Sequence, residues 1–469
     1  MSSIYKNLFY TIASNIVSFA CSVLITLIIP KRLGIDDYGY FQLYLFYTTY
    51  IGFLHFGWAD GVLLRYGGAY YEKLDKPKIN AQFLMYSGVE IAIGFLVILF
   101  GIFGGSGEGR MWVIIFTGIS IVFTLPRTFL QYILQATNRI KEYAFLTVVE
   151  KIIYLSVTII VLFTGTKSFI PILVADILGK AISFVYSALK CTDLIKTQPE
   201  NIKDAISETK LNISVGIKLM FANIASLLII GLVRLAIERQ WDVATFGKVS
   251  LTMSVSNMLM VFIHAIASVL FPMLRRAREE QLSEIYSLMR LCLMTALLGM
   301  LVFYYPIKEV LSLWLPQYAD SLAYMALLFP MCIYESKMSM LIETYMKTIR
   351  LEKKLLLVNV ITMFLSILLT GITVYKLHNL DMAIGMIVVV LAFRCICAEL
   401  MLAKKMQIFV KFDIIQEVLL TVGFIISNWT IGGVAGVGIY IVLYIVYLIL
   451  HFRELRDVVN RILKRKAIS

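Results

Sequence analysis

The sequence predicts an all-α integral membrane protein with about 14 transmembrane helices, arranged as two pseudo-symmetric six-helix lobes followed by a C-terminal helix pair. Of its 469 residues, 60% are hydrophobic and 16% are charged, whereas a soluble protein has about 45–50% apolar and about 25% charged residues. The mean hydropathy is +0.84. The apolar residues fall into runs of about 20, the length of a helix that crosses a bilayer. These observations exclude a soluble enzyme, a secreted disulfide scaffold and a disordered chain.

The expected spans are apolar runs separated by charged or turn-rich breaks. The last two are separated only by the residues 428–431. In chain order the spans are 8–30, 40–64, 83–103, 111–135, 143–163, 169–189, 211–233, 243–270, 286–305, 321–346, 355–375, 381–401, 412–428 and 432–451.

Lysine and arginine residues are distributed unequally between the two sides of these spans. The N-terminus, the loops on its side and the C-terminal tail contain 27 of them, and the opposite loops contain 8. The positive-inside rule therefore predicts a multi-pass protein with both termini cytoplasmic. The net charge of +13 is then explained by these loops and by anionic membrane lipids as partners, so we expect no nucleic acid partner.

The six cysteines show no spacing typical of a disulfide framework or a metal site, and no phosphate-binding loop or HExxH motif occurs. We therefore expect no catalytic residues, no metal and no cofactor other than a coupling proton or sodium ion. A membrane enzyme would need large loops outside the bilayer or an acidic metal motif, and the longest linker is only the segment 190–210.

The two halves of the chain resemble each other at an offset of 208 residues. Asn15-Ile16-Val17-Ser18 aligns with Asn223-Ile224-Ala225-Ser226, and Tyr38-Gly39 aligns with Phe246-Gly247. Six spans per half give a parallel repeat, in which a substrate site lies between the lobes. The expected organisation is an N-lobe at 1–189, a cytoplasmic linker at 190–210, a C-lobe at 211–401, and an extra helix pair with a basic tail at 402–469.

Polar residues follow one face of the first span. Ser14, Ser18, Ser22 and Thr26 recur every fourth residue with Asn15 beside them, and the repeat-equivalent span carries Lys218, Asn223 and Ser226. A hydrated cavity wall is one interpretation, with Asn15, Ser18, Asn223 and Ser226 as its polar residues. Close packing of helices through small residues is the other.

Eight basic residues fall inside the expected spans, where a charge is costly. Arg127 and Lys337 occupy equivalent helices, each about 13 Å from the cytoplasmic end at 1.5 Å per residue. We expect Arg290, near a helix end, to extend to the headgroups, and Lys180 to pair with Asp176 one turn away. The predicted cationic substrate site comprises Arg65, Arg127, Lys218, Lys337 and Arg394.

Glycines are dense at the end of the second span, in the run from Gly57 to Gly68. This density predicts a helix that bends or unwinds there. Asp60 and Arg65 at this place suggest a gate or ligand contact, although an ordinary interfacial helix end explains them equally well. Asp60, Glu90 and Asp176 are the candidates for ion coupling or gating.

Two runs resemble a known family. Residues 30–39 (PKRLGIDDYG) and 60–68 (DGVLLRYGG) resemble the N-terminal half of Wzx-type polysaccharide repeat-unit flippases, and Arg127 through Arg139 to Tyr143 resembles the fourth-helix region of that family. These flippases form the polysaccharide transport branch of the multidrug/oligosaccharidyl-lipid/polysaccharide (MOP) superfamily.

The resemblance implies a function in the bacterial cytoplasmic membrane. It implies that the chain moves undecaprenyl-diphosphate-linked oligosaccharides from the inner to the outer leaflet by alternating access, for capsule, exopolysaccharide or O-antigen assembly. A polysaccharide polymerase machinery is the implied protein partner. A lipid II flippase and a multidrug or cation antiporter of the same superfamily are the alternatives, and a membrane polysaccharide polymerase or glycosyltransferase is the alternative from another class.

Overall fold

The computed structural model describes residues 2–105, 107–258, 260 and 279–457, and within these ranges the chain is helical with no strand. The first half contains α1 (Ser2–Arg32), α2 (Ile35–Tyr50), α3 (Trp58–Tyr66), α4 (Lys76–Phe103), α5 (Glu108–Ala136), α6 (Ile140–Phe163), α7 (Ile170–Lys190), α8 (Thr192–Ile195) and α9 (Ile202–Gln240). Short helices η1 (Ile51–Phe53) and η2 (Tyr71–Lys73) flank α3.

The second half is also built of helices, several of them interrupted. It contains α10 (Val243–Asn257), α12 (Glu279–Met300), η3 (Leu301–Phe303), α13 (Tyr304–Trp314), η4 (Pro316–Tyr318), α14 (Ala319–Leu322), α15 (Met325–Leu328), α16 (Met331–Ser336), η5 (Lys337–Glu343), α17 (Thr344–Thr348), α18 (Glu352–Thr370), η6 (Gly371–Lys376), α19 (Leu380–Met406), α20 (Lys411–Ile426), η7 (Ser427–Ile431) and α21 (Gly433–Leu450). The elements η5, η6 and η7 are π-helical.

Among the described residues, twelve helices are long and apolar enough to cross a membrane. They coincide with twelve of the expected spans. The expected span 40–64 is interrupted between η1 and α3, and part of the span 243–270 lies outside the described residues, as do parts of the basic loop after it and of the tail. The all-α membrane fold is thus confirmed, whereas the count of fourteen is not.

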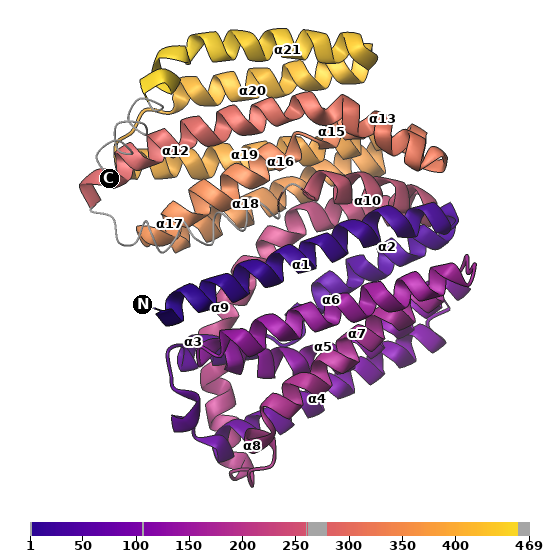
Figure 1. Cartoon of the computed structure of the whole chain (residues 1–469), viewed down its shortest axis with the longest axis vertical. Coiled ribbons are helices and arrows are strands. Elements are labelled where there is room, and N and C mark those ends of the chain that lie inside the picture. The colour runs from indigo at the N-terminus through magenta and orange to yellow at the C-terminus, as the bar shows by residue number, and fades with distance from the viewer. Residues whose placement is uncertain (1, 106, 259, 261–278, 458–469) are drawn as a thin grey trace. The chain divides into compact units, whose positions relative to one another are not determined.

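The chain divides into two compact units. Unit 1 comprises residues 1–224 and 242–247, and unit 2 comprises residues 225–241 and 248–469. The boundary falls inside α9, whereas the sequence suggested a boundary in the linker 190–210. The beginning of the seventh expected span therefore belongs to unit 1, and α20 and α21 belong to unit 2 (Figure 1).

Unit 1 is built around α5, which packs against α3, α4 and α7, while α1 packs on α6. Gly94 and Gly118 let α4 and α5 approach closely, because a Cβ on Gly118 would lie 2.7 Å from the carbonyl oxygen of Gly94. The aromatic core of this unit includes Trp58, Tyr86 and Phe129. This packing fixes the positions of the polar residues that these six helices carry.

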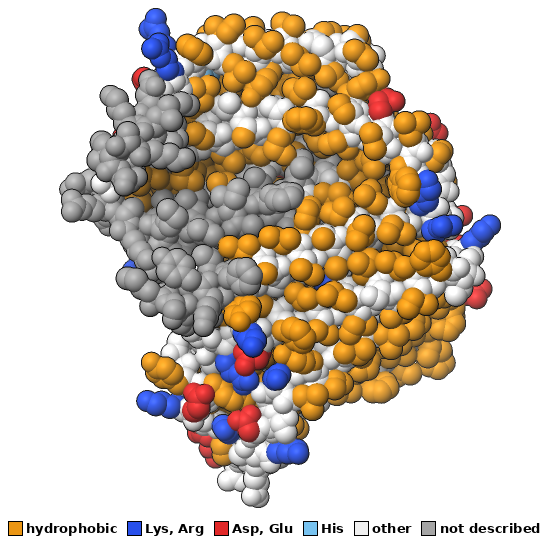
Figure 2. All heavy atoms as spheres, in the orientation of Figure 1, with side chains coloured by type: hydrophobic (Ala, Val, Ile, Leu, Met, Phe, Trp, Pro, Cys, Tyr) orange, Lys and Arg blue, Asp and Glu red, His pale blue; other side chains and the backbone are white. Residues whose placement is uncertain are grey.

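In unit 2, α19 packs against α16 and α18, and α20 packs against α21. The extra pair α20–α21 also contacts α12, and Figure 1 shows the three helices side by side. On the face drawn in Figure 2, hydrophobic side chains cover long stretches of the helices and many charged ones lie near helix ends. Such a surface suits a hydrocarbon environment.

Candidate functional site

The glycine-rich run forms a break in the second expected span, as predicted. Residues 54–57 lie between η1 and α3, with Phe56 at φ +50° and Gly57 at φ +80°. A side chain on Gly57 would lie 2.5 Å from the backbone nitrogen of Ile217, and one on Gly61 would lie 1.9 Å from the carbonyl oxygen of Asn212. The break therefore packs backbone to backbone on the first part of α9.

Arg65 fixes the end of α3 to the same helix. It forms an ion pair of 2.8 Å with Glu208 and donates to the Asn212 side chain at 2.7 Å. Asn212 donates in turn to Gln82 of α4 at 2.5 Å. The side chain of Arg65 remains 29% exposed. These polar contacts hold the C-terminal end of α3 in a defined position, although the expected span is broken before α3.

Arg127 is buried in unit 1 and paired with Glu150 of α6. Its Nη1 also lies 3.3 Å from the hydroxyl of Ser183 on α7. The guanidinium therefore joins three helices, and its charge is neutralised inside the unit.

Lys180 and Asp176 form the predicted pair within α7, with Nζ and Oδ2 2.6 Å apart. Tyr44 of α2 donates to Asp176 at 2.5 Å, and Lys180 donates to Ser120 of α5 at 2.8 Å. Both charged side chains are buried. The group ties α2, α5 and α7 together through direct contacts.

Four buried charges form a closed ring in unit 2. Lys337 Nζ lies 2.5 Å from Glu399 and 2.6 Å from Glu417. Arg290 binds the same two carboxylates at 2.7 and 2.5 Å, and Asp413 at 3.1 Å. The ring joins α12, η5, α19 and α20. The expectation that Arg290 extends to the headgroups is wrong, because three carboxylates hold it inside the protein.

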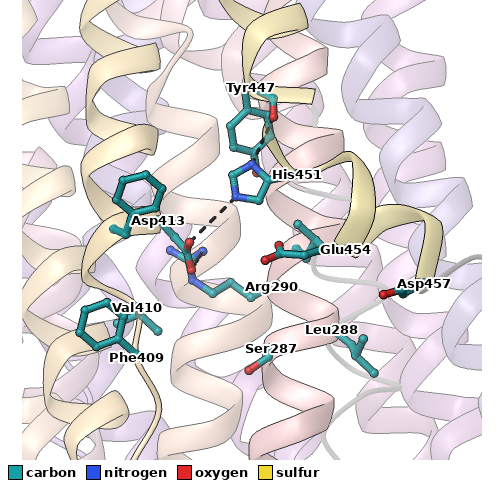
Figure 3. A pocket seen from close by; sticks show the side chains of 12 residues that line it. Ser287, Leu288, Arg290, Phe409, Val410, Asp413, Tyr447, His451, Glu454 and Asp457 are labelled. Carbon is teal, nitrogen blue, oxygen red and sulfur yellow. Dashed lines mark hydrogen bonds and ion pairs between the residues drawn. The ribbon is translucent and has the colours of Figure 1, made fainter. Parts of the chain in front are cut away.

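A pocket of about 650 Å³ opens onto this ring from beside α12, α20 and α21. Figure 3 shows Arg290, Asp413 and His451 facing one another, with Tyr447 above them and Glu454 beside Arg290. His451 Nε2 lies 4.0 Å from Asp413. Each of the three guanidinium nitrogens of Arg290 contacts a carboxylate, so the charge of Arg290 is already paired on the described side of this pocket.

Arg394 occupies a similar network on the other side of α19. It donates to Asn359 at 2.9 Å, to Ser226 at 2.8 Å and to Glu343 at 3.0 Å, and lies 3.4 Å from Glu335. Only 3% of its side chain is exposed. Ser226, expected to line a cavity, is therefore an acceptor for Arg394.

Lys218 differs from the other four predicted basic site residues. It is exposed on α9, and within the described parts of the chain it has no hydrogen bond or ion pair. Asn223, one turn and a residue further along, is exposed too, and so is Asn15 on α1. Ser18 is half-buried. These four side chains of the predicted site could contact a ligand without first releasing an ion pair.

Asp60 and Glu90 lie in unit 1 and are buried, with exposed fractions of 6% and 1%. Asp60 lies 4.0 Å from His55 Nε2. Asp176, the third candidate for ion coupling, is bound by Lys180 and Tyr44. In the described residues, no group of three or more His, Cys, Asp or Glu side chains is arranged to hold a metal ion.

Sequence reasoning did not identify the acidic partners Glu150, Glu399 and Glu417. The sequence did contain a signal for these partners, because each is an acidic residue inside or beside an apolar run. Their partners are 23 to 127 residues away along the chain. Only the helix packing determines which base each acid meets.

The fold is that of a multi-pass membrane protein with paired charges inside two helical units. No family model and no curated protein matches the sequence. The lipid II flippase MurJ in an inward closed conformation aligns with a TM-score of 0.65 and 14% identity, over 96% of this chain and 99% of that one. A multidrug resistance MATE transporter in an inward-facing conformation aligns with a TM-score of 0.61 and 11% identity, over 84% and 98%.

A MOP superfamily transporter from Pyrococcus furiosus aligns with a TM-score of 0.53 and 11% identity, over 86% and 96%. The three structures share one architecture with this chain. Its fold is therefore the fold of the MOP superfamily of transporters and flippases.

Proposed function

We propose that this protein is a flippase that moves an undecaprenyl-diphosphate-linked oligosaccharide repeat unit across the bacterial cytoplasmic membrane by alternating access. The observation that carries the proposal is the alignment with MurJ, which covers nearly all of both chains. The MATE alignment leaves 16% of this chain uncovered. A lipid-linked substrate is therefore favoured over a soluble drug or cation.

The substrate contains a diphosphate, which cannot enter hydrocarbon without replacing its hydration. Lys218 is the side chain best suited to meet it, because its ammonium group is exposed and unpaired among the described residues. Arg65 is partly exposed and offers a second positive charge. Arg127, Lys337 and Arg394 would bind the anion only after release of their carboxylates. Asn15 and Asn223 are assigned to sugar hydroxyls or water.

The test is transport of a defined lipid-linked oligosaccharide in proteoliposomes, with lipid II as the competing substrate. Lys218→Gln should reduce flipping at least several-fold, Lys218→Arg should retain it, and the matched control Lys210→Gln, an exposed lysine earlier on α9, should be normal. Flipping of lipid II but not of oligosaccharide repeat units would show that the substrate is lipid II and not the proposed repeat unit. No flipping of either by folded protein would refute the proposal.

A further inference from the structure

The pocket beside α12, α20 and α21 contains a buried histidine with one unpaired ring nitrogen. His451 lines this pocket and is 7% exposed. Its Nδ1 lies 3.2 Å from the carbonyl oxygen of Tyr447. A carbonyl oxygen can only accept, so in the neutral ring Nδ1 carries the proton and Nε2 is an acceptor. Among the described residues Nε2 has no hydrogen-bond partner, and Figure 3 shows it directed toward Asp413.

The group opposite this nitrogen is a second acceptor. Asp413 contacts Arg290 through Oδ2 at 3.1 Å, while its Oδ1 lies 4.0 Å from His451 Nε2. A carboxylate oxygen and an unprotonated ring nitrogen cannot bond to each other. Two acceptors 4.0 Å apart can, however, share one donor atom that lies about 2.9 Å from each. The gap between Asp413 and His451 is therefore shaped for a donor with at least two hydrogens.

The charge around this gap is negative. The side chain of Asp413 is 35% exposed, and Glu454 and Asp457, which also line the pocket, are exposed. Figure 3 shows Glu454 beside Arg290, all of whose guanidinium nitrogens already contact carboxylates. A cation is thus attracted to the gap, whereas an anion such as a diphosphate is repelled. A primary ammonium group has a positive charge and three N–H groups, so it satisfies both acceptors.

An apolar surface continues from the pocket along α20. Phe409 and Phe412 line the pocket and are 80% and 60% exposed. Ile415 and Leu419 follow Phe412 on the same face of α20, at intervals of three and four residues, and are 55% and 65% exposed. The pocket lies where the candidate spans 411–431 and 433–450 begin and end, which is the level of the headgroups, and the apolar face extends from there toward the hydrocarbon. This combination fits a lipid with an ammonium head better than a free amine.

We propose that this pocket binds the head of phosphatidylethanolamine. The ammonium group lies between His451 Nε2 and Asp413 Oδ1, Glu454 adds negative charge at the opening, and an acyl chain covers Phe412 and Ile415. The lipid contacts α12, α20 and α21 together and so stabilises their packing. The inference is independent of the proposed transport function, because none of the five basic residues predicted for the substrate site lines this pocket.

The test is lipid binding to purified protein, measured by native mass spectrometry with three phospholipids that have identical acyl chains. Phosphatidylethanolamine has a positive charge with N–H donors, phosphatidylcholine has the charge without N–H donors, and phosphatidylglycerol has no ammonium group. Phosphatidylethanolamine should bind at least about tenfold more tightly than either of the others, because only it makes charge-assisted hydrogen bonds here. Equal binding of all three lipids, or equal binding of the first two, would overturn the proposal.

His451→Phe removes the acceptor but keeps a ring against Tyr447, whose centroid lies 4.4 Å from that of His451. This variant should bind phosphatidylethanolamine about tenfold more weakly, with no change for phosphatidylcholine. Glu454→Gln, at an exposed position where packing is not disturbed, should also weaken the binding of phosphatidylethanolamine, by a smaller factor. Glu352→Gln, which alters an exposed acid in the first turn of α18, is the matched control and should bind normally.

Unchanged affinity for phosphatidylethanolamine in His451→Phe and in Glu454→Gln would place the bound lipid elsewhere and overturn the assignment. Glycerophosphoethanolamine, the water-soluble head without acyl chains, distinguishes a lipid from a free amine. It should displace the lipid only at concentrations far above that of the lipid itself, because it does not cover the apolar face of α20. Displacement at equal concentration would show that the pocket takes a soluble amine and not a lipid.

Discussion

The ammonium group of Lys337 lies 2.5 Å from the carboxylate of Glu399, although 62 residues separate them in the chain. Glu417 and Arg290 complete the ring around this contact. Each of the four charges has at least two opposite neighbours, so every charge in the ring is compensated by direct contacts. Removal of one member leaves a buried excess charge, which is costly in low dielectric.

We expect Lys337→Met to lower the free energy of unfolding by about 3–5 kcal/mol, because Glu399 and Glu417 would share Arg290 alone. The measurement is thermal unfolding of purified protein in detergent. The double variant with Glu417→Gln should recover part of the loss. Lys347→Met, which removes a largely exposed lysine paired with Glu343, is the control and should cost less than about 1 kcal/mol. Equal losses of unfolding free energy in the Lys337→Met and Lys347→Met variants would contradict the stabilising role of the ring.

Gly61→Ala should disturb the contact between α3 and α9, because its Cβ would lie 1.9 Å from the Asn212 carbonyl oxygen. Overpacking of this kind costs about 1–3 kcal/mol. The readout is the yield of monodisperse protein and its unfolding temperature. Gly88→Ala on α4, where nothing lies within 4 Å of the added carbon, should be neutral. A stable Gly61→Ala protein would show that the helices are further apart.

Arg394→Lys should destabilise unit 2 although it conserves the charge. The guanidinium reaches Asn359 through Nε, and Ser226 and Glu343 through Nη2, whereas a lysine has a single ammonium head. We expect an unfolding free energy lower by about 1–3 kcal/mol, since buried acceptors lose their donors. Proteolysis at rising temperature measures this loss. An unchanged unfolding free energy in the Arg394→Lys variant would mean that the positive charge alone stabilises the protein at this position.

The stability of α8 should depend on pH through Asp193, which lies outside the expected spans. Burial alone would raise the pKa of Asp193, but hydrogen bonds from Lys76 and Tyr71 outweigh it and hold the pKa below its ordinary value of 3.8. A lowered pKa gives stability that is present above pH 3.8 and is lost as the pH falls through the folded value. Because the carboxylate is 47% exposed, the contribution is at most about 1 kcal/mol.

Hydrogen exchange of the residues 192–197 should therefore quicken, relative to the chemical rate, below about pH 4. In Asp193→Asn the faster exchange should be present at neutral pH and should not change further on acidification. Exchange that is insensitive to both the substitution and the pH would show that this contact does not hold α8.

Local composition was sufficient to predict twelve of the helices and the break at Gly57. Apolar runs of bilayer length form helices because their backbone groups must bond internally. The pair of Lys180 and Asp176 was also predictable, since one turn of helix brings its members together. Arg290 was predicted wrongly, because its position along α12 does not reveal Glu399 and Glu417, which approach from two other helices.

The sequence by itself determined that this chain is a helical membrane protein with bases inside its spans, because hydropathy and local spacing depend only on neighbouring residues. The tertiary structure decided which of those bases are available. Packing of distant helices places carboxylates against Arg127, Lys337 and Arg394 and leaves Lys218 exposed. Electrostatic pairing depends on distance in space, which the order of residues along the chain does not specify.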